Sequence, residues 1–526
     1  AGAGAADEPG RGPGPDPMDS AAAGPGASDG RGGSCGGAGG GVARLRADGK
    51  PLEPWQVEYL PLTELKYKEA QCHIADGEHS AAISSLESIM QFARTAEMQV
   101  CLARTYEEAN LKRNAQDSYK NALRVNPLAV EALVPLLGLM TRKNPRQMLE
   151  EVWDIVQPGL ARIRLPSESG SGKGSQGQQP LSKQRLPWLV RFAEGHAYSL
   201  GNRPEAALEH WEHLERLYPQ NLPALLNMGK AHMDLDQWDQ AQTSFKKARV
   251  VDDMCMDLMD CYGIVMRQEG LPGGLNRLAH ELLSVDQHRP ETWVVAALYS
   301  EVRGDQDKAL SFISKALELH PKHALAYILK GSLLSGAGRR DEAQAAFFKA
   351  NSLRKDIHSF KGLVGAYLAT SMYTEAGFVA KEASALMPGD ARTVILSGRV
   401  WEHCARGQSN LLQRAKAAYQ RALEMDPVSL DATLALADCH MQTKEYAECI
   451  KLLLKMLPEH TRDTLYTKLA DAYRLSKQYS DALAFYHMAI SLNPNCVPAT
   501  QGLEKLEKVM RGVDPDCSDE VPGVGG

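Results

Sequence analysis

The segment DTLYTKLADAYRLSKQYSDALAFYHMAISLNP, residues 463–494, contains two short amphipathic patterns joined by a polar turn. Apolar and small residues recur in it at helical spacing, and a proline closes the unit because proline disfavours helical geometry just before it. The pattern is carried by Tyr466, Leu469, Ala470, Tyr473, Ala482, Tyr486, Ala489 and Pro494. We therefore expect two antiparallel helices whose small residues allow a close approach.

The same pattern recurs every thirty-four residues between Trp188 and Pro388. Three series carry the period: Gly195, Gly229, Gly263, Ala297, Gly331 and Gly365; Ala207, Ala241, Leu275, Ala309 and Ala343; Leu214, Ala248, Leu282, Ala316 and Ala350. A thirty-four-residue period of helix–turn–helix units is typical of the tetratricopeptide repeat. The sequence thus predicts an all-α superhelical solenoid of about a dozen helical hairpins, with disordered N- and C-terminal tails.

The rest of the chain divides around this array. A weaker pair, Val130–Met140 and Gln147–Val156, lacks the small residues, and a stretched copy at Asp390–Pro427 places its extra residues, RGQSNLLQ, in the turn. Segments rich in Gly, Pro and Ser cannot bury enough apolar surface to offset the entropy of ordering. The predicted organisation is a disordered low-complexity segment at 1–61, N-terminal helical repeats at 62–165, a flexible polar linker at 166–187, the repeat array at 188–496, a capping helix at 497–511 and a disordered tail at 512–526.

Composition narrows the classes of function. The net charge of −6 over 526 residues gives no electrostatic reason to expect a nucleic-acid or membrane surface. Ten cysteines are scattered singly, several of them within helical patterns (Cys72, Cys101, Cys261, Cys439), and no signal peptide is recognised. Reduced cysteines and the missing signal favour a reducing compartment, so we expect the nucleus and cytoplasm.

Three patterns were considered as sites of chemistry. GSGKGS at 170–175 lacks the first glycine of a phosphate-binding loop and the hydroxyl residue directly after lysine. The pairs His210/His213 and His320/His323 have no further ligands at zinc spacing. Neither a nucleophile with its base nor a pair of carboxylates can be singled out. We therefore predict no catalytic, cofactor-binding or metal-binding residues, no cofactor, and no enzyme activity.

Aromatic residues could in principle form a base-stacking surface. Most of them instead fall at positions that pack one helix on another, so we expect them in the core. They are Trp188, Trp211, Trp238, Trp293, Trp401, Tyr419 and Tyr486.

The inner surface of such an array is lined by the first helix of each pair and typically binds a peptide or another array. Asn227 and Lys230 lie on a first helix and are residue types that could hold a peptide backbone or carboxylate. Polar residues of this kind are also expected at solvated positions of a helix surface without any ligand. The sequence is compatible with both interpretations.

Several strings with few generic repeat residues appear in a fixed order. They are ELKYKEAQC (64–72), RVNPLAVEALVPLLGL (124–139), MDLMDCYGIVMRQEG (256–270), VDQHRPETWVV (285–295), YILKGSLLSGAGRRDEA (327–343) and GLEKLEK (502–508). Together with the repeats, they resemble the tetratricopeptide subunit 7 family of the anaphase-promoting complex, or cyclosome. The resemblance spans about Leu62 to Arg511.

This resemblance implies a non-catalytic scaffold of a cell-cycle ubiquitin ligase that stacks on other tetratricopeptide subunits. It also implies a homodimer formed through N-terminal repeats. Here the residues before Leu62 are low-complexity where the family has an apolar helical region, so the dimerising repeat is not evident in this sequence.

Two other classes of protein share the repeat architecture. A co-chaperone or peptide adaptor would use the inner groove, but its clamp residues should recur on three adjacent first helices, and only Asn227 and Lys230 form a candidate set. An enzyme with attached repeats would need a separate segment without the repeat period. Between residues 62 and 511 the sequence shows helical hairpins and short linkers, with no separate domain of that kind.

Overall fold

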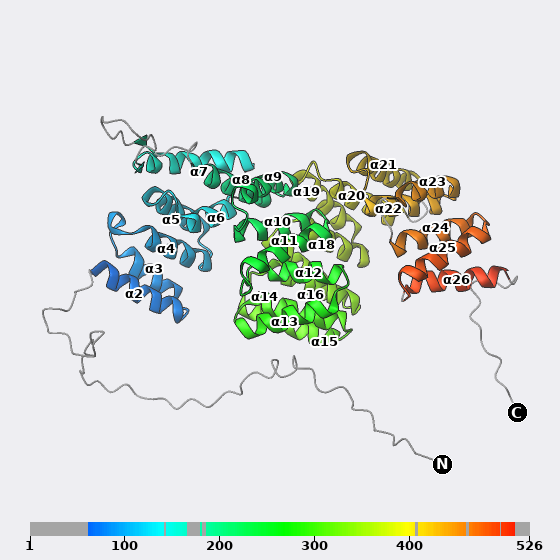
Figure 1. Ribbon diagram of the computed structural model, residues 1–526, viewed down its shortest axis with the longest axis horizontal. Coiled ribbons are helices and arrows are strands. Elements are labelled where there is room, and N and C mark those ends of the chain that lie inside the picture. The colour runs from blue at the N-terminus through cyan, green and yellow to red at the C-terminus, as the bar shows by residue number, and fades with distance from the viewer. Residues whose placement is uncertain are drawn as a thin grey trace, which may run out of the picture. The chain divides into compact units, whose positions relative to one another are not determined.

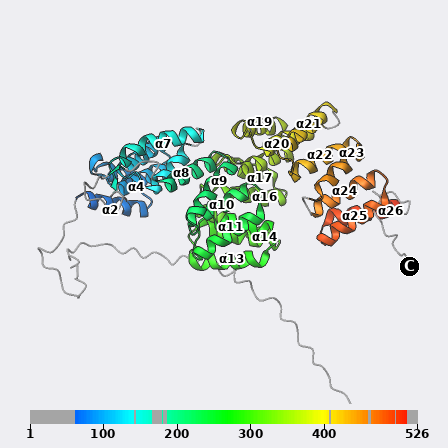
Figure 2. The same ribbon diagram turned by 45° about the horizontal axis from the view of Figure 1, so that its top comes forward.

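The structure, a computed structural model, describes residues 62–140, 144–165, 179–180, 186–405, 409–458, 462–494 and 496–510. These residues form two compact units, and the boundary between them lies between Gln287 and His288. Each unit is a row of antiparallel α-helices (Figures 1 and 2). The predicted tetratricopeptide fold is confirmed.

In the described part of the first unit there are six helix pairs. Its elements are α2 (Leu62–Ala75), α3 (His79–Glu87), the 3₁₀ turn η2 (Gln91–Ala93), α4 (Ala96–Glu108), α5 (Lys112–Val125), α6 (Val130–Leu139), α7 (Pro145–Leu160), β1 (Arg164–Leu165), β2 (Gln179–Pro180), α8 (Pro187–Leu200), α9 (Pro204–Leu217), α10 (Leu222–Asp234), α11 (Trp238–Val251), α12 (Met259–Gln268) and α13 (Pro272–Val285).

Among the residues that the structure places in the second unit there are six further pairs and one additional helix. Its elements are α14 (Pro290–Val302), α15 (Gln306–Leu319), α16 (Ala324–Gly336), α17 (Arg340–Leu353), α18 (Ile357–Ala369), α19 (Tyr373–Leu386), α20 (Ala391–Ala405), α21 (Ser409–Met425), α22 (Leu430–Gln442), α23 (Tyr446–Met456), α24 (Asp463–Leu475), α25 (Tyr479–Leu492) and α26 (Val497–Met510).

The pair α24 and α25 shows how the small residues act. Ala470 of α24 and Ala482 and Ala489 of α25 are completely buried, so the two helices approach closely. Tyr486 of α25 is also buried, and its hydroxyl donates a hydrogen bond to Asp471 Oδ1 at 2.6 Å. Small residues let the backbones approach while the aromatic ring fills the remaining space, with its polar end satisfied.

Most turns within a helix pair carry one residue in the left-handed region. The residue is glycine at Gly270 (φ 66°), Gly304 (φ 85°) and Gly338 (φ 76°), but Asn202 (φ 54°) and Asp236 (φ 58°) take the same conformation. These types tolerate it because glycine has no Cβ and short polar side chains bond locally. The five residues follow one another at intervals of thirty-four.

The thirty-four-residue period fails at Gly365, which the sequence places last in the series that begins at Gly195. Gly365 is exposed, and the equivalent position of α18 is filled by Val364, which is 1 % exposed. The cause is the connection between repeats, because residues 320–323 join α15 to α16 whereas only residues 354–356 join α17 to α18. This repeat spans thirty-three residues, and the assignment of Gly365 was wrong.

The shorter connection is held by a capping box at the start of α18. The backbone N–H of Ser359 donates to Asp356 Oδ1 at 2.8 Å, and the N–H of Asp356 donates to Ser359 Oγ at 3.2 Å. The shift also changes the packing of Phe347. A Cβ added to Gly331 of α16 would lie 2.8 Å from this ring, and one added to Gly362 of α18 would lie 2.4 Å from it. One ring is therefore held between two glycines of consecutive first helices.

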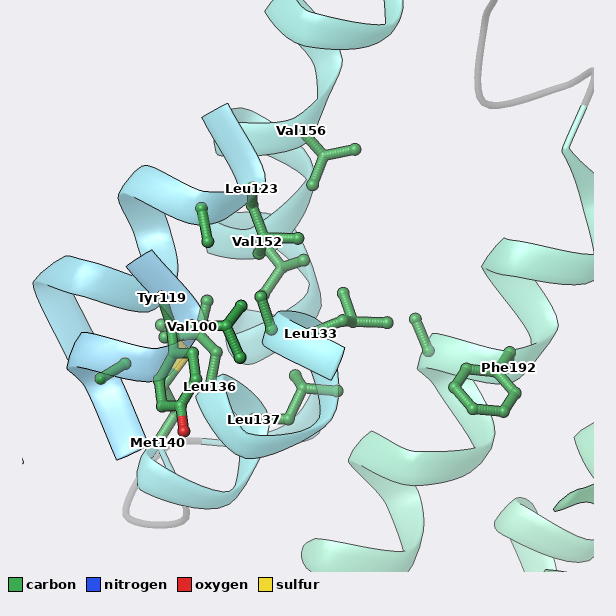
Figure 3. Packing of buried hydrophobic residues seen from close by; sticks show 14 of the residues in the cluster. Val100, Tyr119, Leu123, Leu133, Leu136, Leu137, Met140, Val152, Val156 and Phe192 are labelled. Atoms are coloured by element: carbon green, nitrogen blue, oxygen red, sulfur yellow. The ribbon is translucent and has the colours of Figure 1, made fainter. Parts of the chain in front are cut away.

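The weak pair predicted after the second hairpin is present as α6 and α7, but it packs differently. Each of these helices packs mainly against α5 and α8. Figure 3 shows their large side chains together with those of α4, α5 and α8 in one cluster. The labelled members include Leu136 and Leu137 of α6 and Val152 of α7, all fully buried. In this pair bulky side chains fill the space between the helices, whereas in the other repeats small residues let the helices approach closely.

A short antiparallel pair closes the base of the predicted polar insert, with Arg164 opposite Pro180 and Leu165 opposite Gln179. Most of the linker predicted at 166–187 lies outside the described residues. The segments predicted to be disordered, 1–61 and 512–526, lie wholly outside them.

Two local assignments need correction. The extra residues of the stretched copy do not all lie in the turn, because residues 409–413 form the first part of α21 and lengthen it to 17 residues. In the first pair the sequence pattern is carried by Leu65, Ala70 and Cys72 and then by Ala82, Leu86 and Ile89. Leu65 is 50 % exposed and Cys72 is also exposed, so these two were wrongly assigned, whereas Ala70 and Ala82 are buried as the pattern required.

The last helix, α26, packs on α25 and α24. Ala499, Gly502 and Leu506 form its buried side, while Glu504 and Lys505 are exposed. Its outward side is therefore polar, as the end of a solenoid requires.

Candidate interaction surface

The first helices of successive repeats form a continuous surface in the second unit. Besides its own partner, α20 contacts α18 and α22, and α22 contacts α24. Side chains from different repeats therefore meet on this surface, which is the usual site of ligand binding in tetratricopeptide arrays. We call the surface made by α18, α20, α22 and α24 the first-helix surface.

Polar contacts cross the first-helix surface from one repeat to the next. Gln442 of α22 donates a hydrogen bond to Glu402 of α20 at 3.0 Å, and Glu402 also accepts one from Tyr419 at 2.8 Å. Further along, Lys468 of α24 forms an ion pair with Asp438 of α22. The contacts of Gln442 with Glu402 and of Lys468 with Asp438 each join two repeats, whereas Tyr419 and Glu402 belong to the same repeat. Polar side chains on this surface therefore also hold neighbouring repeats together.

A longer contact joins helices that are not neighbours. Lys361 of α18 lies with its Nζ 2.8 Å from Oδ2 of Asp431 on α22, although α20 lies between these helices in the repeat order. Arg399 of α20 approaches the same oxygen to 3.7 Å. Burial raises the pKa of Asp431, but Lys361, Arg399 and Arg462 lower it, and the net shift is downward. The carboxylate is therefore held ionised among three cations.

The candidate pair in the first unit is arranged differently. Asn227 of α10 donates its side-chain amide to the carbonyl of Pro223 in the same helix at 2.8 Å. The charge of Lys230 lies near enough to His196 of α8 to act on the pKa of that ring. One of the two residues thus uses its amide within its own helix.

His196 gives the first unit a predicted pH dependence. Burial, and secondly the charge of Lys230, lower the pKa of His196 to about 4. The unfolded chain takes up this proton below about pH 6.5, so between pH 6.5 and 4 it binds more protons than the folded chain. Stability is therefore lost as the pH falls through this window.

We expect that wild-type protein loses about 2 kcal/mol more than His196→Gln between pH 7.5 and pH 5. Urea unfolding at the two pH values measures the difference. His403→Gln, a change at an exposed histidine of α20, is the control and should follow the wild type. A wild-type loss equal to that of His196→Gln would contradict the buried, neutral state of this ring.

The histidines considered as metal ligands have other contacts. His210 stacks on Tyr198 with 5.3 Å between ring centroids and lies 3.3 Å from Glu194. His323 caps α16 by accepting a hydrogen bond from the N–H of Ala326 at 3.1 Å. Within the residues that the structure places, no three His, Cys, Asp or Glu side chains form a metal-binding group.

The aromatic residues divide into two groups. Trp211, Trp293, Tyr419 and Tyr486 are completely buried, as expected for core positions. Trp188 and Trp238 are half-buried, and Trp401 is 36 % exposed, so these three do not belong to the fully buried core. The glycine-rich string at 170–175 lies outside the described ranges.

Sequence reasoning missed the cluster of Lys361, Arg399 and Asp431. Lys361 and Asp431 are seventy positions apart, and neither is unusual for a helix surface. The available signal was that all three lie on first helices at exposed or half-buried positions.

None of the helices in the described ranges is both long and apolar enough to span a bilayer. The repeat geometry and the surface built by first helices define this chain as a tetratricopeptide-repeat solenoid protein. Family models described as tetratricopeptide repeat match residues 223–249, 408–473 and 463–496.

A curated protein from Arabidopsis thaliana, anaphase-promoting complex subunit 7, is 32 % identical over 457 residues, covering 87 % of this chain and 77 % of that protein. The chain belongs to the anaphase-promoting complex subunit 7 family. A shorter part, 40 % of the chain, is 25 % identical to 31 % of anaphase-promoting complex subunit 3 from Schizosaccharomyces pombe.

The fold is also similar to a solved structure described as the APC/C hetero-tetramer Cut9-Hcn1. The TM-score is 0.59 at 16 % identity, and the match covers 84 % of this chain and 83 % of that one. At this level of identity the similarity concerns the fold alone.

Proposed function

We propose that this chain is a non-catalytic scaffold subunit of an anaphase-promoting complex. It stacks on other tetratricopeptide subunits and supports cell-cycle-regulated protein ubiquitination. The observation that carries this function is the 32 % identity to anaphase-promoting complex subunit 7 across 87 % of the chain.

A scaffold role rather than a catalytic one agrees with the chemistry of the buried side chains. Burial, and then Glu402, raise the pKa of the Cys439 thiol to about 12, and burial raises that of Cys449 to about 11. Thiols of this kind stay protonated and are poor nucleophiles at neutral pH. On the first-helix surface, Glu402 and Asp438 are engaged in contacts between repeats.

The proposed partners are other tetratricopeptide subunits of the same complex. The similarity of part of this chain to subunit 3 supports a shared repeat architecture among the subunits. Homodimerisation through N-terminal repeats is kept as a second association. The net charge of −6 supports a protein partner rather than nucleic acid or a membrane. We propose that the protein functions in the nucleus and cytoplasm.

The co-chaperone or adaptor function is not favoured. Such a clamp would need free polar groups on adjacent first helices, and the amide of Asn227 bonds within its own helix. The relatives named above are subunits of the anaphase-promoting complex rather than chaperone adaptors.

Affinity purification of the tagged full chain from dividing cells tests the scaffold function. We expect a large assembly that contains other tetratricopeptide subunits, identified by mass spectrometry after gel filtration at moderate salt. The tag alone is the control. If heat-shock chaperones were the main proteins recovered, the adaptor function would replace the scaffold function.

A further inference from the structure

Three cations gather around one carboxylate on the first-helix surface. Lys361 and Arg399 approach Oδ2 of Asp431 to 2.8 Å and 3.7 Å, and the charge of Arg462 also acts on this carboxylate. The other carboxylates named on this surface are already engaged, Glu402 by Gln442 and Tyr419 and Asp438 by Lys468. The chain as a whole has a net charge of −6, so this group of cations differs from the average. A cluster of this sign attracts acidic groups that most of the protein would repel.

The cluster is accessible and comes from three different repeats. The side chain of Lys361 is 52 % exposed, that of Arg399 is 35 % exposed, and that of Asp431 is 49 % exposed. Arg462, directly before α24, is exposed as well. One turn beyond Lys361, a Cβ on Gly365 would meet nothing within 4 Å, so there is open space over this part of α18.

Asp431 shows how a carboxylate fits between these cations. Its Oδ2 accepts from Lys361 Nζ at 2.8 Å while Arg399 remains at 3.7 Å, beyond hydrogen-bond distance. Arg399 could therefore shorten its contact to a second carboxylate. An ammonium group has three donors, of which Asp431 uses one. The cluster can thus accept further acidic oxygens without breaking the contact between α18 and α22.

We propose that Lys361, Arg399 and Arg462 form a docking site for an acidic, extended segment of a partner protein. The carboxylate of Asp431 shows how a carboxylate of that segment would be bound. An extended segment suits the site because Lys361 lies on α18, Arg399 on α20 and Arg462 directly before α24, rather than on one helix. Aspartate or glutamate side chains of the segment would contact the cations in turn. On this protein the proposed site consists only of side chains of this chain. Its binding can therefore be tested without the other subunits of the complex.

The test uses the purified full chain and a fluorescein-labelled peptide of alternating glycine and glutamate with an amidated C-terminus. A glutamine version of the peptide is the neutral probe. Fluorescence anisotropy at low salt should show at least tenfold tighter binding of the acidic probe, and the difference should shrink as salt screens the charges. Equal binding of the two probes would overturn the proposal.

Replacing a cation and replacing Asp431 should change the affinity for the acidic probe in opposite directions. Arg399→Gln and Arg462→Gln should each weaken binding of the acidic probe roughly three- to tenfold. Asp431→Asn should strengthen it by a similar factor, because it removes the competing carboxylate. Lys455→Gln, at an exposed lysine of the second helix α23, should change nothing. Thermal melting checks that each variant remains folded.

A purely structural ion cluster predicts a different result. In that case Asp431→Asn would leave the binding of the acidic probe unchanged or weaken it, and the docking site would be refuted. The chain also carries its own acidic residues in 514–520. If removing residues 511–526 strengthened binding more than Asp431→Asn does, the occupant would belong to this chain and the partner proposal would be wrong.

Discussion

Replacing Trp211 by alanine is expected to lower the free energy of unfolding of the surrounding repeats by about 3–5 kcal/mol. The indole is completely buried, and it lies edge-on to Phe192 and His196 with ring centroids 5.6 Å and 4.9 Å away. A Cβ on Gly195 would lie 2.6 Å from the indole, so the backbone of α8 rests on the ring. Its removal leaves a cavity that the neighbouring helices can fill only partly.

Urea unfolding followed by circular dichroism, with hydrogen exchange of α8 and α9 amides, measures this loss. Hydrogen exchange is needed because repeats can open locally rather than all at once. Trp401→Ala is the comparison variant, since Trp401 is 36 % exposed, and it should cost less, about 1–2 kcal/mol. Similar losses for the two variants would contradict the assignment of Trp211 to the core.

Replacing Ala489 or Ala470 by tryptophan is expected to destabilise the C-terminal repeats by about 1–3 kcal/mol or more. Both alanines are completely buried at the contact between α24 and α25. A large ring there must separate the two helices or force a side chain away from its preferred rotamer. The midpoint of thermal unfolding and exchange of α24 and α25 amides report the effect.

Ala484→Trp provides the control on the same helix, because Ala484 is exposed. It should change stability by no more than about 0.5 kcal/mol. Unchanged melting of the Ala489 or Ala470 variant would show that the repeat register is misassigned.

Much of the fold could be predicted from the sequence because the repeat positions are a local code. A small residue such as Ala470 and an aromatic such as Tyr486, sixteen positions later, define how two helices meet. Nearly all of that information lies within one hairpin. The same code failed at α18, where Gly362 and Gly365 are both plausible contact residues and only the length of the preceding connection decides between them.

The candidate interaction surface could be predicted far less well. The contact of Lys361 with Asp431 depends on how two repeats are placed across a third, and no period in the sequence encodes that distance. Charged residues are common on helix surfaces, so their types alone carry little information. The packing of α6 and α7 could not be predicted from the sequence for a related reason, because bulky residues can fill space in more than one arrangement.

The ring of Phe347, held between Gly331 and Gly362, constrains the order in which these positions can change during evolution. An alanine at either glycine would collide with the ring, whereas a smaller residue at 347 alone would leave space on both sides. Each single change is therefore disfavoured until another has occurred. We expect the three positions to vary together among descendants of this gene, with the aromatic residue and its two glycines kept or lost as a set.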